Sequence, residues 1–153
     1  NEVGVSQRHL GKYSNSAYAL VMPTSQIDIL ENYVWLDGLQ VLRTGGGEIV
    51  GLSNGALDMK LSNSIIMGPG SSSNTECFCS SGGAGSLYVW NNIFTGCYSD
   101  PTGALHITGL TAAYVYNNTF YNNRVGIYQT SGTYARVKNN IAGVAPTQGR
   151  GSD

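Results

Sequence analysis

Charged side chains are scarce in this sequence. Lys, Arg, Asp and Glu make up 11% of its 153 residues, against about a quarter in an average domain. The formal net charge is −1, so there is no electrostatic argument for nucleic-acid binding, and no apolar run is long enough to predict a membrane span. Asn, Ser, Thr, Gly and Tyr supply the polar surface instead, which is typical of β-rich secreted or virion proteins. We therefore expect an extracellular or virion-surface protein without nucleic-acid or membrane partners.

Cysteine is also sparse, and processing signals are lacking. Three cysteines are too few for the disulfide framework of a small secreted domain. The chain begins with Asn rather than Met, and no basic flank followed by an apolar run precedes the first predicted strand. These features predict either a processed chain or a piece of a longer protein.

A motif returns five times, as VWLDGLQV, MKLSNSII, LYVWNNIF, AYVYNNTF and ARVKNNIA. Aligned on Gly38, Asn63, Asn91, Asn117 and Asn139, the copies are spaced by 25, 28, 26 and 22 residues by subtraction. A drifting period of this size is typical of stacked structural repeats. In each copy apolar residues alternate with polar or aromatic ones, which predicts a strand. The copies therefore predict parallel strands, one coil above the last.

A second strand signal lies between most copies, at residues 48–50, 77–79, 105–107 and 127–129, and each is followed by a Gly- or Ser-rich turn. Each repeat therefore predicts two strands and two turns. In its V-x-I-x-N-N-x-F and G-I-Y-x phrases the chain resembles the repeats of the pectate-lyase-like superfamily over Ile27 to Ala142. This resemblance implies an all-β fold, a right-handed parallel β-helix of about five coils. It implies no single activity, because the same coil carries lyases, adhesins, phage tailspikes and inert scaffolds.

The recurrent Asn predicts a structural ladder. A coil corner needs a residue that tolerates left-handed backbone and whose amide bonds to the Asn one coil above. We expect this ladder to face inward, which would hide the sequon Asn117-Asn118-Thr119 from glycan transfer. The predicted ladder comprises Asn63, Asn91, Asn117 and Asn139.

Three regions are predicted along the chain. They are an irregular N-terminal segment or first coil over residues 1–26, β-helix repeats over 27–142, and a C-terminal loop or tail over 143–153. Neither end contains an amphipathic capping helix in its sequence pattern. We therefore expect another protein subunit or a neighbouring domain to cover at least one end of the solenoid.

Strand alternation predicts whether the side chains of the cysteines and of one histidine face the core or the solvent. Cys77 and Cys79 have the parity of inward-facing positions, and Cys97 lies in a later insertion. Two interpretations stay open, namely buried thiols that act as small hydrophobes, or a disulfide from Cys97 to Cys77 or Cys79. Because C-x-C lacks the usual zinc spacing and His106 has the opposite parity, we predict no metal site and no cofactor. The outer column at this position contains Phe78, His106 and Tyr128.

The outer columns of the first strand position form the candidate binding face. Coils stacked at about 4.8 Å place these side chains on one surface. Aromatic rings beside hydrogen-bonding groups suit sugar rings, and they also suit protein interfaces. The alternative is that the rings only stack on one another and stabilise the sheet. The predicted binding face comprises Trp35, Lys60, Tyr88, Trp90, Tyr114, Tyr116, Arg136 and Lys138.

Catalytic residues are not predicted. The resembling lyases use acidic residues that hold calcium and an Arg or Lys as base, but Asp37 is alone among the acids on the candidate face, and the other acids scatter. The insertions at 67–75 and 95–103 leave the same corner and carry no recognisable chemistry.

The sequence therefore predicts a non-catalytic structural and binding module of an extracellular or virion assembly, such as a phage fibre, spike or decoration component. Its aromatic face would contact other subunits or a cell-surface glycan. The alternative is a polysaccharide-active enzyme, a lyase or hydrolase, or its carbohydrate-binding fragment.

Overall fold

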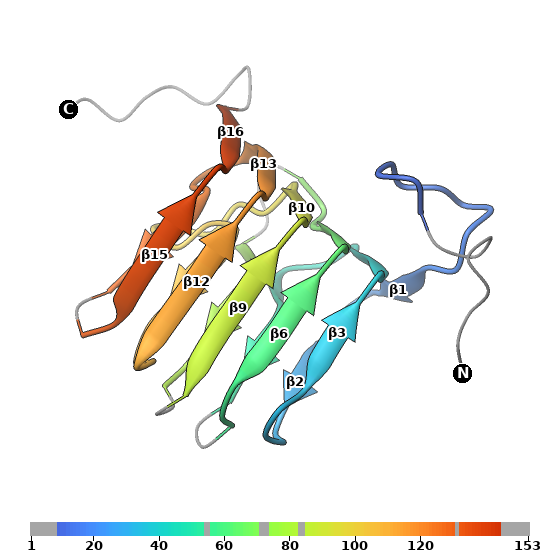
Figure 1. Ribbon diagram of the computed structural model, residues 1–153. Coiled ribbons are helices and arrows are strands. Elements are labelled where there is room, and N and C mark those ends of the chain that lie inside the picture. The colour runs from blue at the N-terminus through green and yellow to red at the C-terminus, as the bar shows by residue number, and fades with distance from the viewer. Residues whose placement is uncertain (1–8, 54–55, 71–73, 83–84, 131, 145–153) are drawn as a thin grey trace.

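The chain folds into a parallel β-solenoid of about five turns, as the repeats predict. The computed structural model describes residues 9–53, 56–70, 74–82, 85–130 and 132–144. Within these residues every paired strand is parallel, and no helix is present. It follows that no described helix has the length and hydrophobicity needed to cross a lipid bilayer. Successive coils stack along one axis, so strands from distant parts of the sequence lie side by side (Figure 1).

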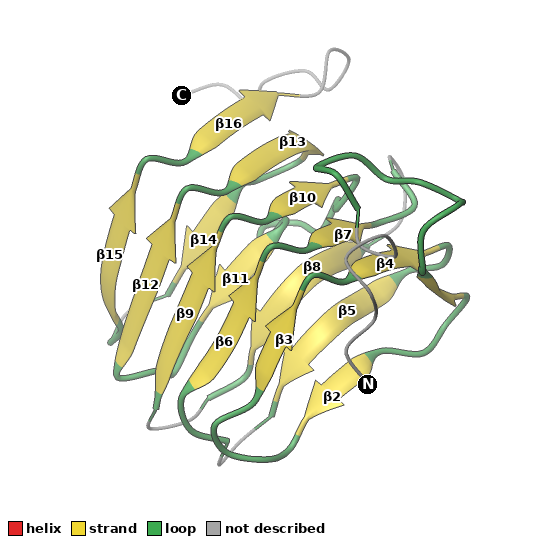
Figure 2. Ribbon diagram, turned by 45° about the vertical axis from the view of Figure 1, so that its right-hand side comes forward, coloured by secondary structure: helices red, strands yellow, loops and turns green. Residues whose placement is uncertain are grey.

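Three sheets run along the solenoid, and each coil contributes to them in turn. Sheet C contains β3 (Trp35–Asp37), β6 (Met59–Ser62), β9 (Ser86–Trp90), β12 (Ala112–Tyr116) and β15 (Tyr134–Lys138). Sheet A contains β1 (Leu20–Met22), β4 (Gln40–Arg43), β7 (Ile65–Met67), β10 (Ile93–Thr95), β13 (Thr119–Asn123) and β16 (Ile141–Val144). Sheet B contains β2 (Ile27–Ile29), β5 (Gly47–Leu52), β8 (Thr75–Ser80), β11 (Leu105–Ile107) and β14 (Ile127–Gln129). Figure 2 shows sheet B behind sheet C.

The expectation of two strands per coil is wrong, because the strands of sheet A form a third. The strands that follow a corner begin two residues after the corner residue, and β7 and β10 are only three residues long. So short a strand shows no alternation of its own. The apolar residues that follow each corner therefore look like the end of the preceding strand in the sequence.

The core lies between the three sheets and is built from the predicted columns. Leu61, Val89 and Val115 are register partners on sheet C, and all three are 0% exposed. On sheet A the rings of Phe94 and Phe120 stack at 5.1 Å. Each such side chain contributes about 1.5–3 kcal/mol when it is removed from water, so the continuous columns supply most of the driving force for stacking the coils.

The corner between sheets C and A has the left-handed backbone that the recurrent Asn predicts. Gly38, Asn63, Asn91, Asn117 and Asn139 all have φ between 50° and 71°. The expected inward orientation of these Asn side chains is wrong, because the last three are exposed and Asn63 is half-buried. A left-handed residue turns the chain so that the following residue points into the core instead.

The inward amide ladder is formed by that following residue. The Nδ2 atom of Asn92 donates to Oδ1 of Asn118 at 3.0 Å, and Nδ2 of Asn118 donates to Oδ1 of Asn140 at 3.0 Å. The same oxygens accept the backbone N–H of the coil below, at 2.9 and 2.8 Å. Among the described residues the expected column keeps one contact between its side-chain amides, from Asn91 to Asn63 at 3.3 Å.

The N-terminal segment packs on the outer face of sheet A before the first coil begins. Gln40 is 1% exposed, since its side-chain amide accepts from the Ser14 N–H at 2.7 Å and donates to the Tyr18 carbonyl at 3.0 Å. The predicted boundary between residues 26 and 27 falls between β1 and β2. Residues 1–8 and 145–153, which belong to the predicted end regions, lie outside the described part of the chain.

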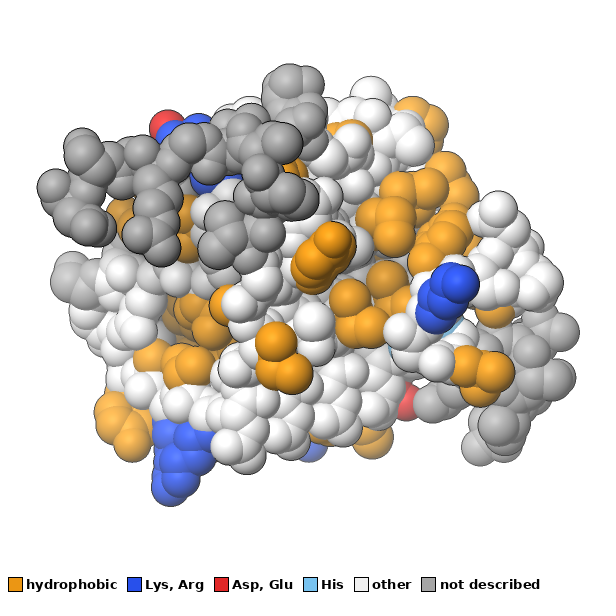
Figure 3. All heavy atoms as spheres, turned by 90° about the horizontal axis from the view of Figure 1, so that it is seen from above, with side chains coloured by type: hydrophobic (Ala, Val, Ile, Leu, Met, Phe, Trp, Pro, Cys, Tyr) orange, Lys and Arg blue, Asp and Glu red, His pale blue; other side chains and the backbone are white. Residues whose placement is uncertain are grey.

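Figure 3 views the molecule from the side on which β10, β13 and β16 lie in Figure 1. Hydrophobic side chains appear there in separate patches with polar atoms between them. Tyr121 and Ile141, which are 56% and 67% exposed, belong to the outer positions of sheet A. The outer positions of sheet A also pair in register, as Ile65 does with Ile93 and Thr95 with Tyr121, but they are mostly aliphatic or polar rather than aromatic.

Candidate functional site

The outer face of sheet C brings the predicted aromatic columns together. Backbone pairing puts Trp35, Lys60, Tyr88, Tyr114 and Arg136 in one column. The same pairing puts Asp37, Ser62, Trp90, Tyr116 and Lys138 in the neighbouring column. Both columns follow directly from uninterrupted alternation along the strands of sheet C. We call this surface the aromatic face.

The rings of the aromatic face contact one another but do not bury one another. Tyr88 and Tyr114 stack at 4.9 Å with an interplanar angle of 11°. Trp35 and Trp90 approach to 6.1 Å with their planes tilted by 36°. The four rings on β9 and β12 are half-buried, and Trp35 is 58% exposed. Ring surface therefore remains available to a ligand after the mutual stacking that the alternative interpretation describes.

Polar groups at the N-terminal end of this face hold one another in place. The indole Nε1 of Trp35 donates to Ser62 Oγ at 2.8 Å, and that hydroxyl donates to Asp37 Oδ1 at 2.6 Å. The Asn63 amide donates to the same carboxylate oxygen at 2.7 Å. The Lys60 Nζ atom lies 5.9 Å from the Trp35 ring centroid, within cation–π range. The orientation of Trp35 is therefore set by hydrogen bonds as well as by packing.

Sheet B has a different outer column from the one that the sequence predicts. Cys79, not Phe78, is the register partner of His106, and His106 pairs with Tyr128. Phe78 is 0% exposed and belongs to the core cluster. The prediction that Cys79 faces inward and that His106 has the opposite parity is therefore wrong.

The reason is a bend within the strands of sheet B. On β5 two consecutive residues, Ile49 and Val50, are 0% exposed and belong to the core. On β8 the same is true of Cys77 and Phe78. Strict alternation would put one residue of each pair outside. After the bend the parity is reversed, so Cys79 reaches the outer side.

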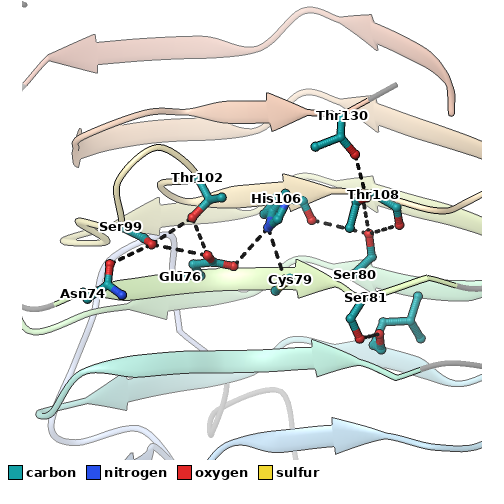
Figure 4. Close-up of polar contacts among 11 residues, drawn as sticks. Asn74, Glu76, Cys79, Ser80, Ser81, Ser99, Thr102, His106, Thr108 and Thr130 are labelled. Carbon is teal, nitrogen blue, oxygen red and sulfur yellow. Dashed lines mark hydrogen bonds and ion pairs between the residues drawn. The ribbon is translucent and has the colours of Figure 1, made fainter. Parts of the chain in front are cut away.

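Outside this bend, three reactive side chains converge. One ligand atom each from Glu76, Cys79 and His106 lies within 4.8 Å of the other two. His106 Nδ1 is 3.4 Å from Cys79 Sγ and 3.3 Å from Glu76 Oε2. Dashed lines in Figure 4 mark both contacts. The other ring nitrogen, Nε2, is buried and has no hydrogen-bond partner among the described residues. We call these three residues the Glu–Cys–His cluster.

The second inserted loop holds the carboxylate of this cluster, and the first loop contacts the second. Thr102 Oγ1 donates to Glu76 Oε1, and Ser99 Oγ lies 3.3 Å from the same oxygen. Ser99 Oγ also donates to Asn74 Oδ1 at 3.0 Å, which links the two loops (Figure 4). These loops, in which the sequence shows no recognisable chemistry, therefore orient Glu76 so that Oε2 faces His106.

Acidic groups surround the cluster on the side of the earlier coils. Glu48 and Glu76 are register partners on adjacent strands, which corrects the expectation that the acids scatter. Gly51 makes room for them, because a Cβ there would lie 2.9 Å from Glu48 Oε2 and 3.2 Å from Asp28 Oδ1. Burial, followed by the charge of Glu76, raises the pKa of Glu48 above its ordinary 4.5.

The surroundings of the Cys79 thiol favour its protonated form. Burial raises the pKa of Cys79 far above its usual range, and the nearby Glu76 and Glu48 carboxylates raise it further. A thiolate is the nucleophilic form of cysteine. The free thiol is therefore not poised as a nucleophile.

A hollow of about 280 Å³ opens beside the cluster. Its walls come from β5, β8 and the segments next to them. It is lined by Gln26, Gly47, Glu48, Asn74, Glu76 and Ser99.

The other two cysteines form a disulfide, which decides between the two open interpretations. Cys77 and Cys97 are bonded, with Cα atoms 5.6 Å apart, and both are 0% exposed. The bond closes a loop of 20 residues between β8 and the second inserted loop. Cys79 is left as the free cysteine.

Comparisons with known proteins add no family to this description. A scan against protein-family models, a search of curated proteins and a search of solved structures each gave no match. What is shown is the parallel β-solenoid itself.

Proposed function

We propose that this chain is a non-catalytic binding module of an extracellular or virion assembly, and that its aromatic face contacts a glycan. The observation that supports this proposal is the continuous set of partly exposed rings on sheet C, at positions that contribute nothing to the core. Five aromatic side chains from three of its five strands share this one surface, namely Trp35, Tyr88, Trp90, Tyr114 and Tyr116. Exposed apolar surfaces of this kind usually mark an interaction site.

The chemistry of the face suits a sugar chain. Its two outer columns contain aromatic, charged and hydroxyl side chains and no aliphatic one. The C–H faces of sugar rings pack on aromatic rings, while their hydroxyls bond to polar groups nearby. Lys60, Arg136 and Lys138 are exposed at the edges of the rings and offer such donors. Contact with another protein subunit is the alternative use of the same face, because Tyr, Trp and Arg are enriched in interfaces.

The setting and the ancestry are parts of the same proposal. An extracellular or virion location is supported by the low content of charged residues. Membership of the pectate-lyase-like superfamily is supported by the resemblance of the repeats. A role as a fibre, spike or decoration component agrees with a stack whose last coil leaves Val137 47% exposed.

Binding to immobilised acidic and neutral polysaccharides tests the proposal. We expect the wild type to bind at least one of them, and a Tyr88/Trp90/Tyr114/Tyr116→Ala variant to bind at least about 30-fold more weakly, since each lost ring contact is worth about 0.5–1.5 kcal/mol. The control Tyr121→Ala removes an exposed ring from sheet A. Light scattering on the same proteins measures their mass in solution and tests the alternative. If the wild type is an oligomer and the folded quadruple variant is a monomer, the aromatic face is a subunit contact.

A polysaccharide-active enzyme is the second candidate, favoured by one observation. Glu48 and Glu76 lie on adjacent strands and line the same hollow. Paired carboxylates of which one has a raised pKa are the machinery of glycoside hydrolysis. Release of reducing ends or unsaturated sugars by the wild type, abolished in both Glu48→Gln and Glu76→Gln, would establish this function in place of simple binding.

A further inference from the structure

The Glu–Cys–His cluster has a geometry that a catalytic triad does not have. A triad uses one nitrogen of the imidazole for the nucleophile and the other for the orienting carboxylate. Here the same nitrogen, His106 Nδ1, faces both Cys79 Sγ and Glu76 Oε2. One ring nitrogen has a single lone pair or a single N–H and cannot make two good hydrogen bonds at once. Three heteroatoms that converge in this way are instead arranged around a common point.

The distances fit a metal ion at that point. Ligand bonds of about 2.0–2.3 Å at tetrahedral angles place neighbouring ligand atoms about 3.3–3.6 Å apart. The nitrogen-to-sulfur and nitrogen-to-oxygen distances are 3.4 and 3.3 Å. The remaining pair lies within 4.8 Å, so a small movement of one side chain completes the triangle.

We propose that Glu76, Cys79 and His106 bind a divalent transition-metal ion of the zinc class. Sulfur, imidazole nitrogen and carboxylate oxygen together are the donors that Zn²⁺ and Co²⁺ accept. Ca²⁺ and Mg²⁺ prefer oxygen ligands only and fit this set poorly. On binding, Cys79 becomes a thiolate ligand and its proton passes to solvent.

The surroundings of the cluster support a cation. Three carboxylates from successive coils, those of Asp28, Glu48 and Glu76, lie close enough together for their charges to repel one another. A bound divalent ion would relieve that repulsion. The hydroxyls of Thr102 and Ser99 meanwhile hold Glu76 through its other oxygen, as outer partners commonly hold the ligands of a metal.

Three protein ligands leave the fourth position of a tetrahedron to a water molecule. The hollow opens to solvent next to one of the three, Glu76, and is lined on the same side by Glu48. Three protein ligands and one open position are typical of zinc sites that exchange a ligand, whereas closed structural sites use four protein ligands. The site is independent of the aromatic face, which lies on a different sheet.

Titration of the full chain with Co²⁺ tests the proposal. The protein is treated with chelator and kept free of thiol reductants, so that the Cys77–Cys97 disulfide stays intact. We expect one equivalent of Co²⁺ to bind with a sulfur-to-metal charge-transfer band and tetrahedral d–d bands, and Zn²⁺ to displace it. Cys79→Ser should abolish the charge-transfer band, and His106→Gln should weaken binding at least about 100-fold.

Matched variants keep the result interpretable. His9→Gln removes the other histidine of the chain and should bind like the wild type. If a ligand variant fails to fold by circular dichroism, Thr102→Val tests the same site by releasing the Glu76 carboxylate, and it should weaken binding about 10–100-fold. Binding without a sulfur band, binding that survives unchanged in folded His106→Gln or Thr102→Val, or no binding at all would each overturn the proposal.

Discussion

The outer faces of sheets C and B put different chemistry on the same coils. On sheet C alternation is unbroken, so like side chains from successive coils form straight columns, and rings stack on rings, as Tyr88 does on Tyr114. On sheet B a bend turns two consecutive residues inward, and the outer positions beside it gather unlike groups, Glu76 and Cys79, against His106. A regular sheet thus repeats one surface, whereas a bend concentrates different side chains at one point.

The largest expected effect tests the bend itself. If Phe78 faces the core, Phe78→Ala should lower the free energy of unfolding by about 3–5 kcal/mol, because a large cavity forms. Tyr88→Ala, on the regular face, should cost about 1 kcal/mol or less, since it removes one stacked pair. Denaturant titration measures both. Equal losses in the two variants would mean that alternation continues through β8 and that Phe78 lies outside.

Of the two cysteines on β8, Cys77 is in the disulfide and Cys79 is free, so their substitutions should differ in cost. The double variant Cys77→Ala/Cys97→Ala should lose about 3 kcal/mol of stability, because a closed loop of 20 residues is opened in the unfolded chain. Cys79→Ala should cost about 1 kcal/mol. Alkylation in denaturant without reductant should label a single thiol per chain. All three cysteines lie on the tryptic peptide 61–124, so fragment-ion sequencing of that peptide after reduction should place the label at Cys79. Three labelled thiols would show that the bond does not form.

The corner beside sheet C offers a comparison between neighbouring residues. Asn118→Ala should cost about 2–3 kcal/mol, because it leaves buried backbone groups of Val89 and Asn92 without their partners. Asn117→Ala should cost about 1 kcal/mol through its left-handed backbone alone, and Asn117→Gly should cost close to nothing. Thermal unfolding ranks the stability of the three variants. A larger loss of stability for Asn117→Ala than for Asn118→Ala would mean that the exposed Asn residues, not the buried ones, form the stabilising ladder.

The smallest effect concerns charge on the outer face of sheet B. Because the pKa of Glu48 is raised on folding above its ordinary 4.5, the ionised carboxylate destabilises the folded state. Wild-type stability should therefore fall, relative to Glu48→Gln, as pH rises through and above 4.5, and the two should converge in acid. Solvent screening limits the gap to about 0.5 kcal/mol or less. Unfolding curves in chelator measure it, and a gap that grows toward acid would reverse the sign.

The aromatic face could be predicted residue by residue, whereas the Glu–Cys–His cluster could not. Tyr88 and Tyr114 occupy equivalent places in repeats that align without gaps, so the column follows from counting in twos. Glu76 and His106 are 30 residues apart, and their meeting depends on the number of residues in an insertion and on a bend that reverses parity. A possible signal was the apolar run that strict alternation leaves unexplained, Ile49-Val50 followed one coil later by Cys77-Phe78.

By itself the sequence determined the all-β class, the parallel stacking, the core columns of sheet C and the left-handed corners. Each of these depends on local preference and on a repeated period, and both are visible along the chain. The tertiary structure alone decided that sheet A is a third layer, that Asn92 and Asn118 rather than Asn91 and Asn117 face inward, and which cysteines pair. These features depend on how the chain turns at its corners and on side chains brought together from distant coils, which no local pattern records.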